Sequence, residues 1–136
     1  MSDGDTLDVR AGDRVRLVQI DAPELGEGEC HARESRRELE RLAAPGERIE
    51  LESDTNLDDT DRYGRLLRYV HAADANVNVE LVRRGAATPY FRSGDEGTYA
   101  AELLAAVDEA RRASRGMWGS CRVSWDPERA VTTRPR

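Results

Sequence analysis

Apolar positions along the chain fall first into short runs that predict β-strands. Two such runs, 6–9 and 14–20, flank a turn that contains glycine, and together they predict a β-hairpin. The second run alternates imperfectly, as expected for a strand that is covered on both faces. Runs of similar length at 48–53 and 65–72 predict two further strands. The first half of the chain is therefore expected to be rich in short strands.

Apolar positions at helical spacing predict three helices. A weak apolar stripe runs through 30–43, and the pair Pro-Gly at 45–46 ends this helix. A short amphipathic helix is predicted over 76–84, where Gly85 ends it. The longest helix is predicted over 97–114, ended by Gly116, after which Met117 and Trp118 should fold back onto the core. Strands with helices between and after them predict an α+β domain.

The length of 136 residues fits a single domain. We expect it to span residues 1–121 and to be followed by a flexible tail at 122–136. No apolar run approaches the roughly 20 residues of a membrane span, and the opening MSDGDT lacks a signal-peptide pattern.

Charge narrows the range of functions. The net charge is −6, and all 21 basic residues are arginine. A protein that coats nucleic acid without specificity needs a broad basic face, so the acidic balance argues against that class. It leaves room for an enzyme that binds phosphate at one focused site.

Two cysteines, Cys30 and Cys121, lie far apart in the sequence. They are either two unrelated thiols or one disulfide, which would stabilise the fold by about 3–5 kcal/mol. A zinc site with His31 and His71 is disfavoured, because close-spaced ligand pairs are missing.

Carboxylates gather at the two ends of the predicted hairpin. Antiparallel pairing places Asp5, at the start of the first strand, beside Asp21, at the end of the second. Like charges this close are costly unless a hard cation neutralises them through oxygen ligands. The Ala22 carbonyl could add a ligand, and Glu24 could reach a metal-bound water. Each acid alone would be read as part of a turn.

Two arginines belong to the same predicted strands. Arg16 lies on the second strand of the hairpin, and Arg65 begins the strand 65–72. A guanidinium fork suits a phosphate group. A metal, a carboxylate that activates water and two arginines are together what phosphodiester hydrolysis requires. The acidic run from Asp54 lacks the glycine and glutamate of a helix–loop–helix calcium loop, so we interpret it as a solvated turn.

Five segments in order, DGDTLDV, VRLVQIDAPE, DRYGRLLRYV, VNVELVRRGAA and the final helix with GMWG, resemble the staphylococcal nuclease-like (thermonuclease) family. The resemblance covers roughly residues 3–119. It implies a five-stranded OB-type β-barrel with three helices. It also implies calcium-dependent hydrolysis of single-stranded DNA and RNA that leaves 3′-phosphates.

The resemblance assigns roles by position. One Ca²⁺ would be held by Asp5, Asp21 and the Ala22 carbonyl, and the catalytic residues would be Arg16, Glu24 and Arg65. Residues expected near the bound nucleotide are Tyr63, Tyr90 and Phe91. Cysteines of many relatives pair at the positions of Cys30 and Cys121, which implies the disulfide.

The resemblance also shows two departures. Family members have apolar residues before DGDT, so the first strand is expected to be truncated here. Either the protein is longer at its N-terminus or its open edge is covered, for example by a second copy. The lysines typical of the family are absent, which would weaken binding of longer substrates. The family and the disulfide favour secretion, with a cytoplasmic location as the alternative.

Three hypotheses follow from the sequence. The first is a metal-dependent nuclease. The second is a non-catalytic binding module, like the degenerate nuclease-like domains of Tudor–staphylococcal nuclease scaffolds. The third is a fragment that folds only as an oligomer or not at all. Such binding modules lose metal or arginine positions, whereas all of those positions are present here, which favours the enzyme.

Overall fold

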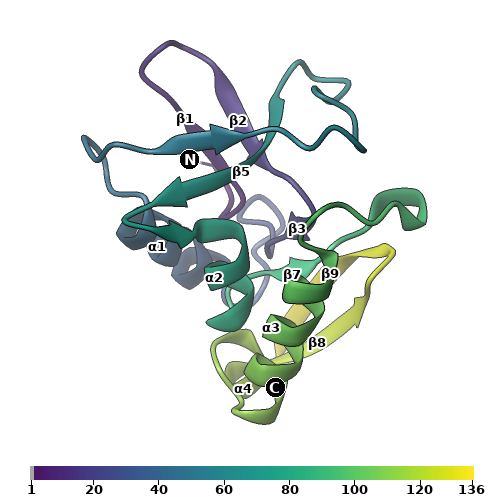
Figure 1. Cartoon of the computed structure of the whole chain (residues 1–136). Helices are drawn as coiled ribbons and strands as arrows, with labels where there is room; N and C mark the ends of the chain where they lie inside the picture. Colours follow the sequence, from purple (N-terminus) through teal and green to yellow (C-terminus); the bar gives the residue numbers. More distant parts are fainter. Residues whose placement is uncertain (1) are drawn as a thin grey trace.

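The largest sheet lies at one end of the molecule and contains the predicted hairpin (Figure 1). A computed structural model describes residues 2–136 of the chain. The strand order in this sheet is β1-β2-β5-β4, with β6 added beside β5. Its strands are β1 (Thr6–Asp8), β2 (Arg14–Leu17), β4 (Glu50–Glu52), β5 (Leu66–Ala72) and β6 (Ala75–Asn76).

The β1–β2 hairpin brings the start of β1 beside the end of β2. Thr6 pairs with Arg16, and the carbonyl of Asp5 accepts a hydrogen bond of 2.8 Å from the Leu17 N–H. β2 is too short to reach Asp21 directly. The chain turns at Gln19, whose φ is 68°, and continues as β3 (Ile20–Asp21), which pairs with β7 (Thr88–Pro89). This turn folds Asp21 back toward Asp5.

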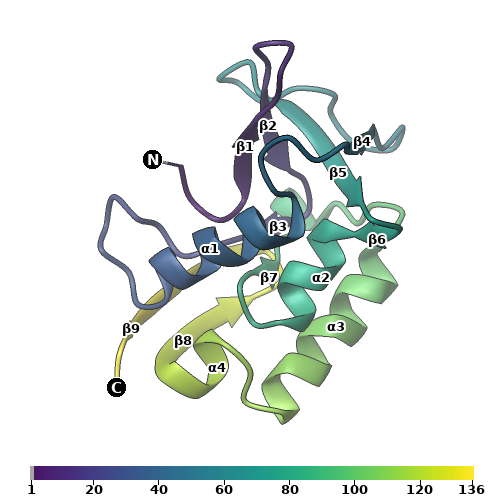
Figure 2. The same cartoon turned by 90° about the vertical axis from the view of Figure 1, so that its left-hand side faces the viewer.

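Three helices cover the strands, as the apolar spacing predicts (Figure 2). They are α1 (Ala32–Leu42), α2 (Val77–Arg83) and α3 (Ala100–Arg112). Leu39, Leu81 and Leu103 are buried in one core with Leu17 and Ile20. Burial of such leucine and isoleucine side chains contributes about 1.5–3 kcal/mol each.

Asn78 connects α2 to the sheet from a fully buried position. Its side-chain oxygen accepts the Val70 N–H at 3.0 Å, and its nitrogen donates to the Val18 carbonyl at 2.9 Å. A buried amide with its hydrogen bonds satisfied fixes two backbone segments at once. It thereby holds the turn that follows β2 against β5, next to the predicted site.

Residues 121–135 form a hairpin where the sequence was expected to give a flexible tail. The helical turn α4 (Met117–Ser120) leads into β8 (Cys121–Asp126), which pairs with β9 (Arg129–Pro135). Trp125 donates its indole N–H to the Pro89 carbonyl at 2.9 Å. The hairpin therefore packs against β7, and Figure 1 shows it beside α3. Its apolar positions are too few to stand out among the charges around them.

The disulfide between Cys30 and Cys121 is confirmed. It joins the loop before α1 to the first residue of β8. Met117 is fully buried beside it, and Trp118 is partly buried, as predicted for the chain after Gly116. Together the sheet, the three helices and the buried core confirm an α+β fold of the OB type. None of the helices within residues 2–136 has the length and apolar character that a bilayer crossing requires.

Candidate active site

Two predicted ligands, Asp5 and Asp21, meet at the guanidinium of Arg16. Nη2 of Arg16 lies 3.4 Å from Asp5 Oδ2 and 3.4 Å from Asp21 Oδ1. The exposed fractions of these side chains are 14% for Arg16, 6% for Asp5 and 13% for Asp21. Two carboxylates and one guanidinium are thus largely removed from water. Their mutual electrostatic interactions are stronger in this environment than they would be in water.

Backbone groups fix the orientation of all three side chains. Asp5 Oδ2 accepts the Ala22 N–H at 2.9 Å, and Asp21 Oδ2 accepts the Val131 N–H at 2.8 Å. Arg16 Nη1 donates to the carbonyl of Ile20 at 2.9 Å. Nη2 is therefore directed at the carboxylate pair by bonds made through the other terminal nitrogen. A site held in this way is preorganised before any ligand binds.

The charge balance of the pair favours a cation. Burial first, and then the negative charge of Asp5, raise the pKa of Asp21, while Arg16 and the Val131 N–H lower it. The net result is a pKa well above the ordinary carboxyl range, because one guanidinium does not offset two buried carboxylates. A bound divalent cation would lower that pKa by favouring the ionised form.

The donor set fits a hard divalent ion. Asp5 and Asp21 provide carboxylate oxygens, and Ala22, whose carbonyl is the third predicted ligand, is fully buried and donates its N–H to Asp5. Oxygen ligands of this kind suit calcium rather than zinc. Within residues 2–136, no group of three or more His, Cys, Asp or Glu side chains gathers at metal-binding spacing. The predicted ligand set contains only two carboxylates, those of Asp5 and Asp21.

Glu24 lies at the exposed rim of this pair, after Pro23. Its backbone N–H donates to Glu29 Oε1 at 2.7 Å. Loss of solvent, followed by the charges of Asp3 and Glu29, raises the pKa of the Glu24 carboxyl. A carboxylate with a raised pKa accepts a proton more readily, which suits a general base.

Arg65 is held by a tight turn that sequence reasoning did not assign to the site. Asp61 Oδ1 accepts the N–H groups of Tyr63 and Arg65, at 2.9 and 3.0 Å. Asp61 Oδ2 accepts Nε of Arg65 at 2.6 Å. Burial raises the pKa of Asp61, but the hydrogen bonds from Arg65 outweigh it and hold the pKa below its usual value. Within residues 2–136, the guanidinium of Arg65 hydrogen-bonds through Nε, and its terminal nitrogens could bind a ligand.

Tyr63 stands out from the surface beside these arginines. It is 68% exposed, and the guanidinium carbons of Arg62 and Arg65 lie 4.9 and 5.4 Å from the centre of its ring. An exposed ring beside two cations is suited to a nucleobase or a sugar face. The nucleotide contact that the family resemblance implies for Tyr63 agrees with this exposed position and stays a prediction.

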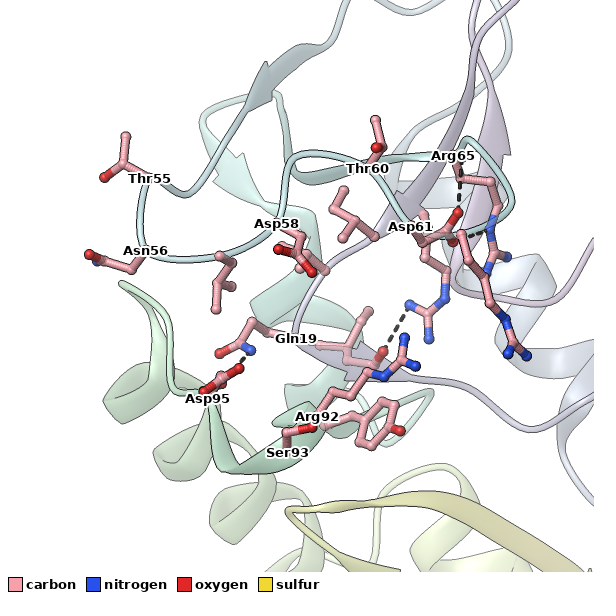
Figure 3. A pocket seen from close by; sticks show the side chains of 17 residues that line it. Gln19, Thr55, Asn56, Asp58, Thr60, Asp61, Arg65, Arg92, Ser93 and Asp95 are labelled. Carbon is pink, nitrogen blue, oxygen red and sulfur yellow. Dashed lines mark hydrogen bonds and ion pairs between the residues drawn. The ribbon is translucent and has the colours of Figure 1, made fainter.

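A cleft of about 720 Å³ connects the two arginines (Figure 3). Arg16 and Arg65 line it together with Tyr90 and with Arg92, which the sequence analysis did not single out. Figure 3 shows Gln19 at its floor, where Nε2 donates to the Asp95 carbonyl at 2.9 Å. The lining also contains acidic side chains, namely Asp58, Asp61 and Asp95. Phosphate is therefore favoured only near the arginines.

Phe91 does not belong to this cleft. It is 3% exposed and packs in the main core, and its N–H donates to the Pro127 carbonyl at 2.6 Å. The expectation that Phe91 contacts the nucleotide is therefore wrong for this chain. Of the adjacent aromatic pair, Tyr90 faces the cleft and Phe91 faces inward, because successive side chains of extended backbone alternate in direction.

The OB-type fold, the buried carboxylate pair at Arg16 and the cleft lined by Arg16 and Arg65 are the features to compare with known proteins. The family model described as "Staphylococcal nuclease homologue" matches residues 14–120, so the chain belongs to this family.

Several relatives carry nuclease names. An uncharacterized endonuclease of Escherichia coli O157:H7 is 38% identical over 120 residues, which is 85% of this chain and 71% of the relative. A micrococcal nuclease of Shigella flexneri is 35% identical over 128 residues, covering 85% of this chain and 68% of the relative. A thermonuclease of Staphylococcus intermedius is 28% identical over 122 residues, covering 85% and 71%.

Proposed function

We propose that this chain is a calcium-dependent endonuclease that hydrolyses single-stranded DNA and RNA to products with 3′-phosphates. Its membership of the staphylococcal nuclease family supports the coarser assignment to nucleases. The observation that carries the finer proposal is the position of Arg16. Its guanidinium joins two buried carboxylates and also lines the cleft that contains Arg65.

One Ca²⁺ would be held by Asp5, Asp21 and the Ala22 carbonyl. When bound, it would neutralise the two carboxylates and polarise the phosphate that undergoes attack. The chain itself supplies the remaining groups. Arg16 is held by its bond to the Ile20 carbonyl, so its orientation does not depend on substrate. Preorganised donors of this kind stabilise a transition state without a reorganisation cost.

The reaction needs a water, a base and charge stabilisation. Glu24 would accept a proton from the attacking water, because loss of solvent and the neighbouring acids raise the pKa of its carboxyl. Arg16 and Arg65 would bind the non-bridging oxygens of the phosphate from two sides. As water attacks, the bond from phosphorus to the 5′-oxygen breaks, and the phosphate stays on the 3′-oxygen.

Tyr63 and Tyr90 would bind the nucleotides that flank the scissile phosphate. Tyr63 projects from the surface, and Tyr90 lines the cleft. A single strand can place its bases on such rings, whereas the bases of a duplex are already stacked and paired. The arrangement therefore favours single-stranded substrates.

The decisive experiment is cleavage of a quenched fluorescent single-stranded DNA at mildly alkaline pH, in calcium and then in excess chelator. We expect cleavage in calcium and its loss in chelator. Circular dichroism on the same sample establishes that the protein is folded. A folded protein that leaves the DNA intact in calcium would contradict the proposal and favour the binding module.

A further inference from the structure

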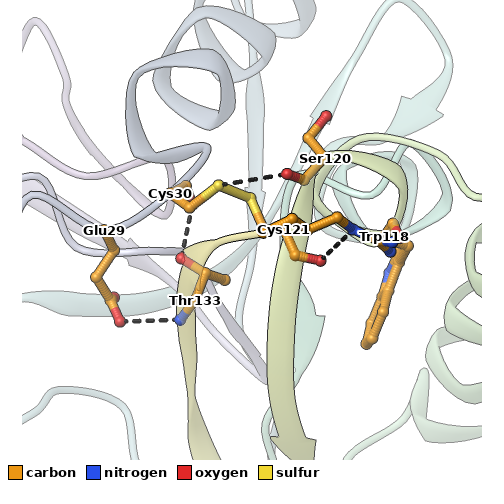
Figure 4. Close-up of a disulfide and its surroundings, with 7 residues drawn as sticks. Glu29, Cys30, Trp118, Ser120, Cys121 and Thr133 are labelled. Atoms are coloured by element: carbon orange, nitrogen blue, oxygen red, sulfur yellow. Dashed lines mark hydrogen bonds between the residues drawn. A yellow bond between two sulfur atoms is a disulfide. The ribbon is translucent and has the colours of Figure 1, made fainter.

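The hairpin β8–β9 lies mostly beyond the segment 14–120 that the family model matches, yet it touches the candidate site. One edge of β9 pairs with β8, and the other faces the loop of residues 21–30. On that outer edge the Val131 N–H donates to Asp21 and the Thr133 N–H donates to Glu29 Oε2 at 3.1 Å. Figure 4 shows the contact between Glu29 and Thr133 beside the disulfide.

Glu29 connects this edge to the backbone of Glu24. While Oε2 accepts from Thr133, Oε1 accepts the N–H of Glu24 at 2.7 Å. The N–H of Glu29 in turn donates to the carbonyl of Glu24 at 3.1 Å. Both oxygens of one carboxylate are thus used, one toward the proposed base and one toward β9. Bonds to an ionised carboxylate are about twice as strong as neutral ones.

The loop between the two glutamates needs such a constraint. It contains Gly26 and Gly28, both exposed, and a side chain at either position would contact nothing within 4 Å. Glycines in an open loop give the backbone wide conformational freedom. Residues at a catalytic site must be held within about 0.5 Å of the productive geometry. Asp3 holds the next residue, because its Oδ1 accepts the Leu25 N–H at 2.7 Å. The N–H of Glu24 itself is held by the side chain of Glu29.

The other side of the loop is held at Cys30. Its carbonyl accepts the Thr133 hydroxyl at 2.6 Å, and its sulfur is bonded to Cys121 at the root of β8. The hairpin is therefore fixed to the loop at residues adjacent in sequence, Glu29 and Cys30. This makes β9 a rigid support rather than a loose neighbour.

We propose that Glu29 is a positioning residue, which fixes the backbone of Glu24 against the outer edge of β9 and makes the hairpin part of the catalytic apparatus. This rests on the proposed nuclease function, in which Glu24 is the base. A role confined to stability would lower the melting temperature and leave the turnover of the folded enzyme unchanged. A positioning role lowers kcat in enzyme that is still folded.

The first test compares Glu29→Gln with Glu27→Gln. Glu27 lies on the same loop and, like Glu29, adds negative charge near Glu24, but it makes no side-chain hydrogen bond within residues 2–136. Glutamine at 29 keeps one acceptor oxygen and turns the other into a donor, so one of the two bonds is lost. Both variants lose a negative charge near Glu24, but only Glu29→Gln also loses a hydrogen bond. The comparison therefore separates the effect of charge from the effect of positioning.

At saturating calcium, we expect Glu29→Gln to lower kcat by about 10- to 100-fold, since small misplacement of a catalytic group has effects of this size. The KM for a DNA oligonucleotide should stay within about twofold, as should both constants of Glu27→Gln. Equal kcat values for the two variants would overturn the proposal. A wild-type protein that cleaves nothing would instead contradict the proposed function.

A second measurement does not depend on activity. Amide hydrogen exchange without calcium or DNA should be faster in Glu29→Gln than in the wild type at Glu24 or at Thr133, by about tenfold or more, since one of these two N–H groups loses its acceptor. Glu27→Gln should match the wild type at both positions. Equal exchange at both amides in all three proteins would mean that Glu29 does not hold them, and the proposal would fail.

The role of the hairpin is tested at Thr133. Thr133→Pro removes the N–H that binds Glu29, while Thr133→Val removes only the hydroxyl. Proline should fit at position 133 of β9, because Pro135, two residues later on the same strand, has its backbone nitrogen on the same edge. With the disulfide intact, we expect Thr133→Pro to lower kcat by about five- to 50-fold and Thr133→Val to retain more activity. An unchanged kcat in folded Thr133→Pro would exclude β9 from the catalytic apparatus.

Discussion

The two halves of the candidate site are built in opposite ways. On the metal side, Asp5, Asp21 and Arg16 are largely buried and held by backbone N–H and carbonyl groups. On the substrate side, Tyr63 is mostly exposed and Arg65 is held by one acid in a tight turn. The first half is preorganised and the second can adjust to a strand. We therefore expect substitutions on the metal side to affect turnover and calcium affinity, and substitutions of Tyr63 on the substrate side to affect KM.

The sharpest test of the preorganised half is Glu24→Gln. A general base contributes about 10²- to 10⁴-fold, so kcat should fall by that factor. The amide has the same shape as the carboxylate, and calcium affinity should change little, because Glu24 is not one of the proposed calcium ligands. Single-turnover cleavage of single-stranded DNA, with a calcium titration on the same variant, checks both expectations. Full activity of Glu24→Gln would show that Glu24 is not the general base.

Asp21→Asn should act on the same half through calcium. The variant keeps its size but loses one of two ligand charges, so the calcium concentration for half-maximal cleavage should rise by about tenfold or more. The matched control is Asp8→Asn, since Asp8 is exposed and paired with Arg14 on the far part of the hairpin. An unchanged calcium titration for Asp21→Asn would show that Asp21 is not a ligand.

Tyr63 tests the adaptable half. Replacing an aromatic ring that stacks on a base costs about 1–3 kcal/mol, so Tyr63→Leu should raise the KM for oligonucleotides by about five- to 100-fold with kcat preserved. Tyr63→Phe keeps the ring and should bind substrate nearly as the wild type does. If leucine and phenylalanine gave the same KM, Tyr63 would have no stacking role.

One buried acid anchors the substrate side, and it predicts a pH dependence of stability. Asp54 accepts the Tyr69 hydroxyl at 2.6 Å and the Thr98 N–H at 2.8 Å. Burial raises the pKa of Asp54, but these bonds outweigh it, and the pKa lies below its ordinary value of 3.8. A group with a lowered pKa stabilises the folded state above pH 3.8, and the contribution is lost as the pH falls through the folded value.

Asp54→Asn should therefore lower the free energy of unfolding by about 1–3 kcal/mol at neutral pH. The difference from the wild type should shrink as the pH falls below the ordinary carboxyl range. Urea unfolding of both proteins across that range measures it. A difference that is the same at neutral and acidic pH would contradict the ionised role of Asp54.

Much of the fold could be predicted from apolar spacing. The hairpin, α1, α2 and α3 were located within a few residues, because each combines a periodic stripe with a glycine or proline at its end. The hairpin at 121–135 was missed, since its exposed positions carry charge and its buried ones are few. The alternation of Val123 with Trp125, and of Val131 with Thr133, is the signal that could have revealed it.

The site was predictable where side chains carry the chemistry. Asp5, Asp21 and Arg16 meet as the hairpin geometry requires, although the turn at Gln19 was not foreseen. The contributions of Val131 and Thr133 were missed, because a backbone N–H can belong to any residue type. Phe91 was misplaced because the sequence alone does not tell which residue of an aromatic pair faces inward.

The carboxylates along β9 also bear on self-association. An edge strand with unpaired N–H groups is a template onto which another chain can add a strand. On the outer edge of β9 the donors of Val131 and Thr133 are occupied by Asp21 and Glu29, and Pro135 has none to offer. The contacts that hold the proposed base therefore also close this edge to strand addition, so Glu29→Gln should increase the tendency of the protein to form β-aggregates.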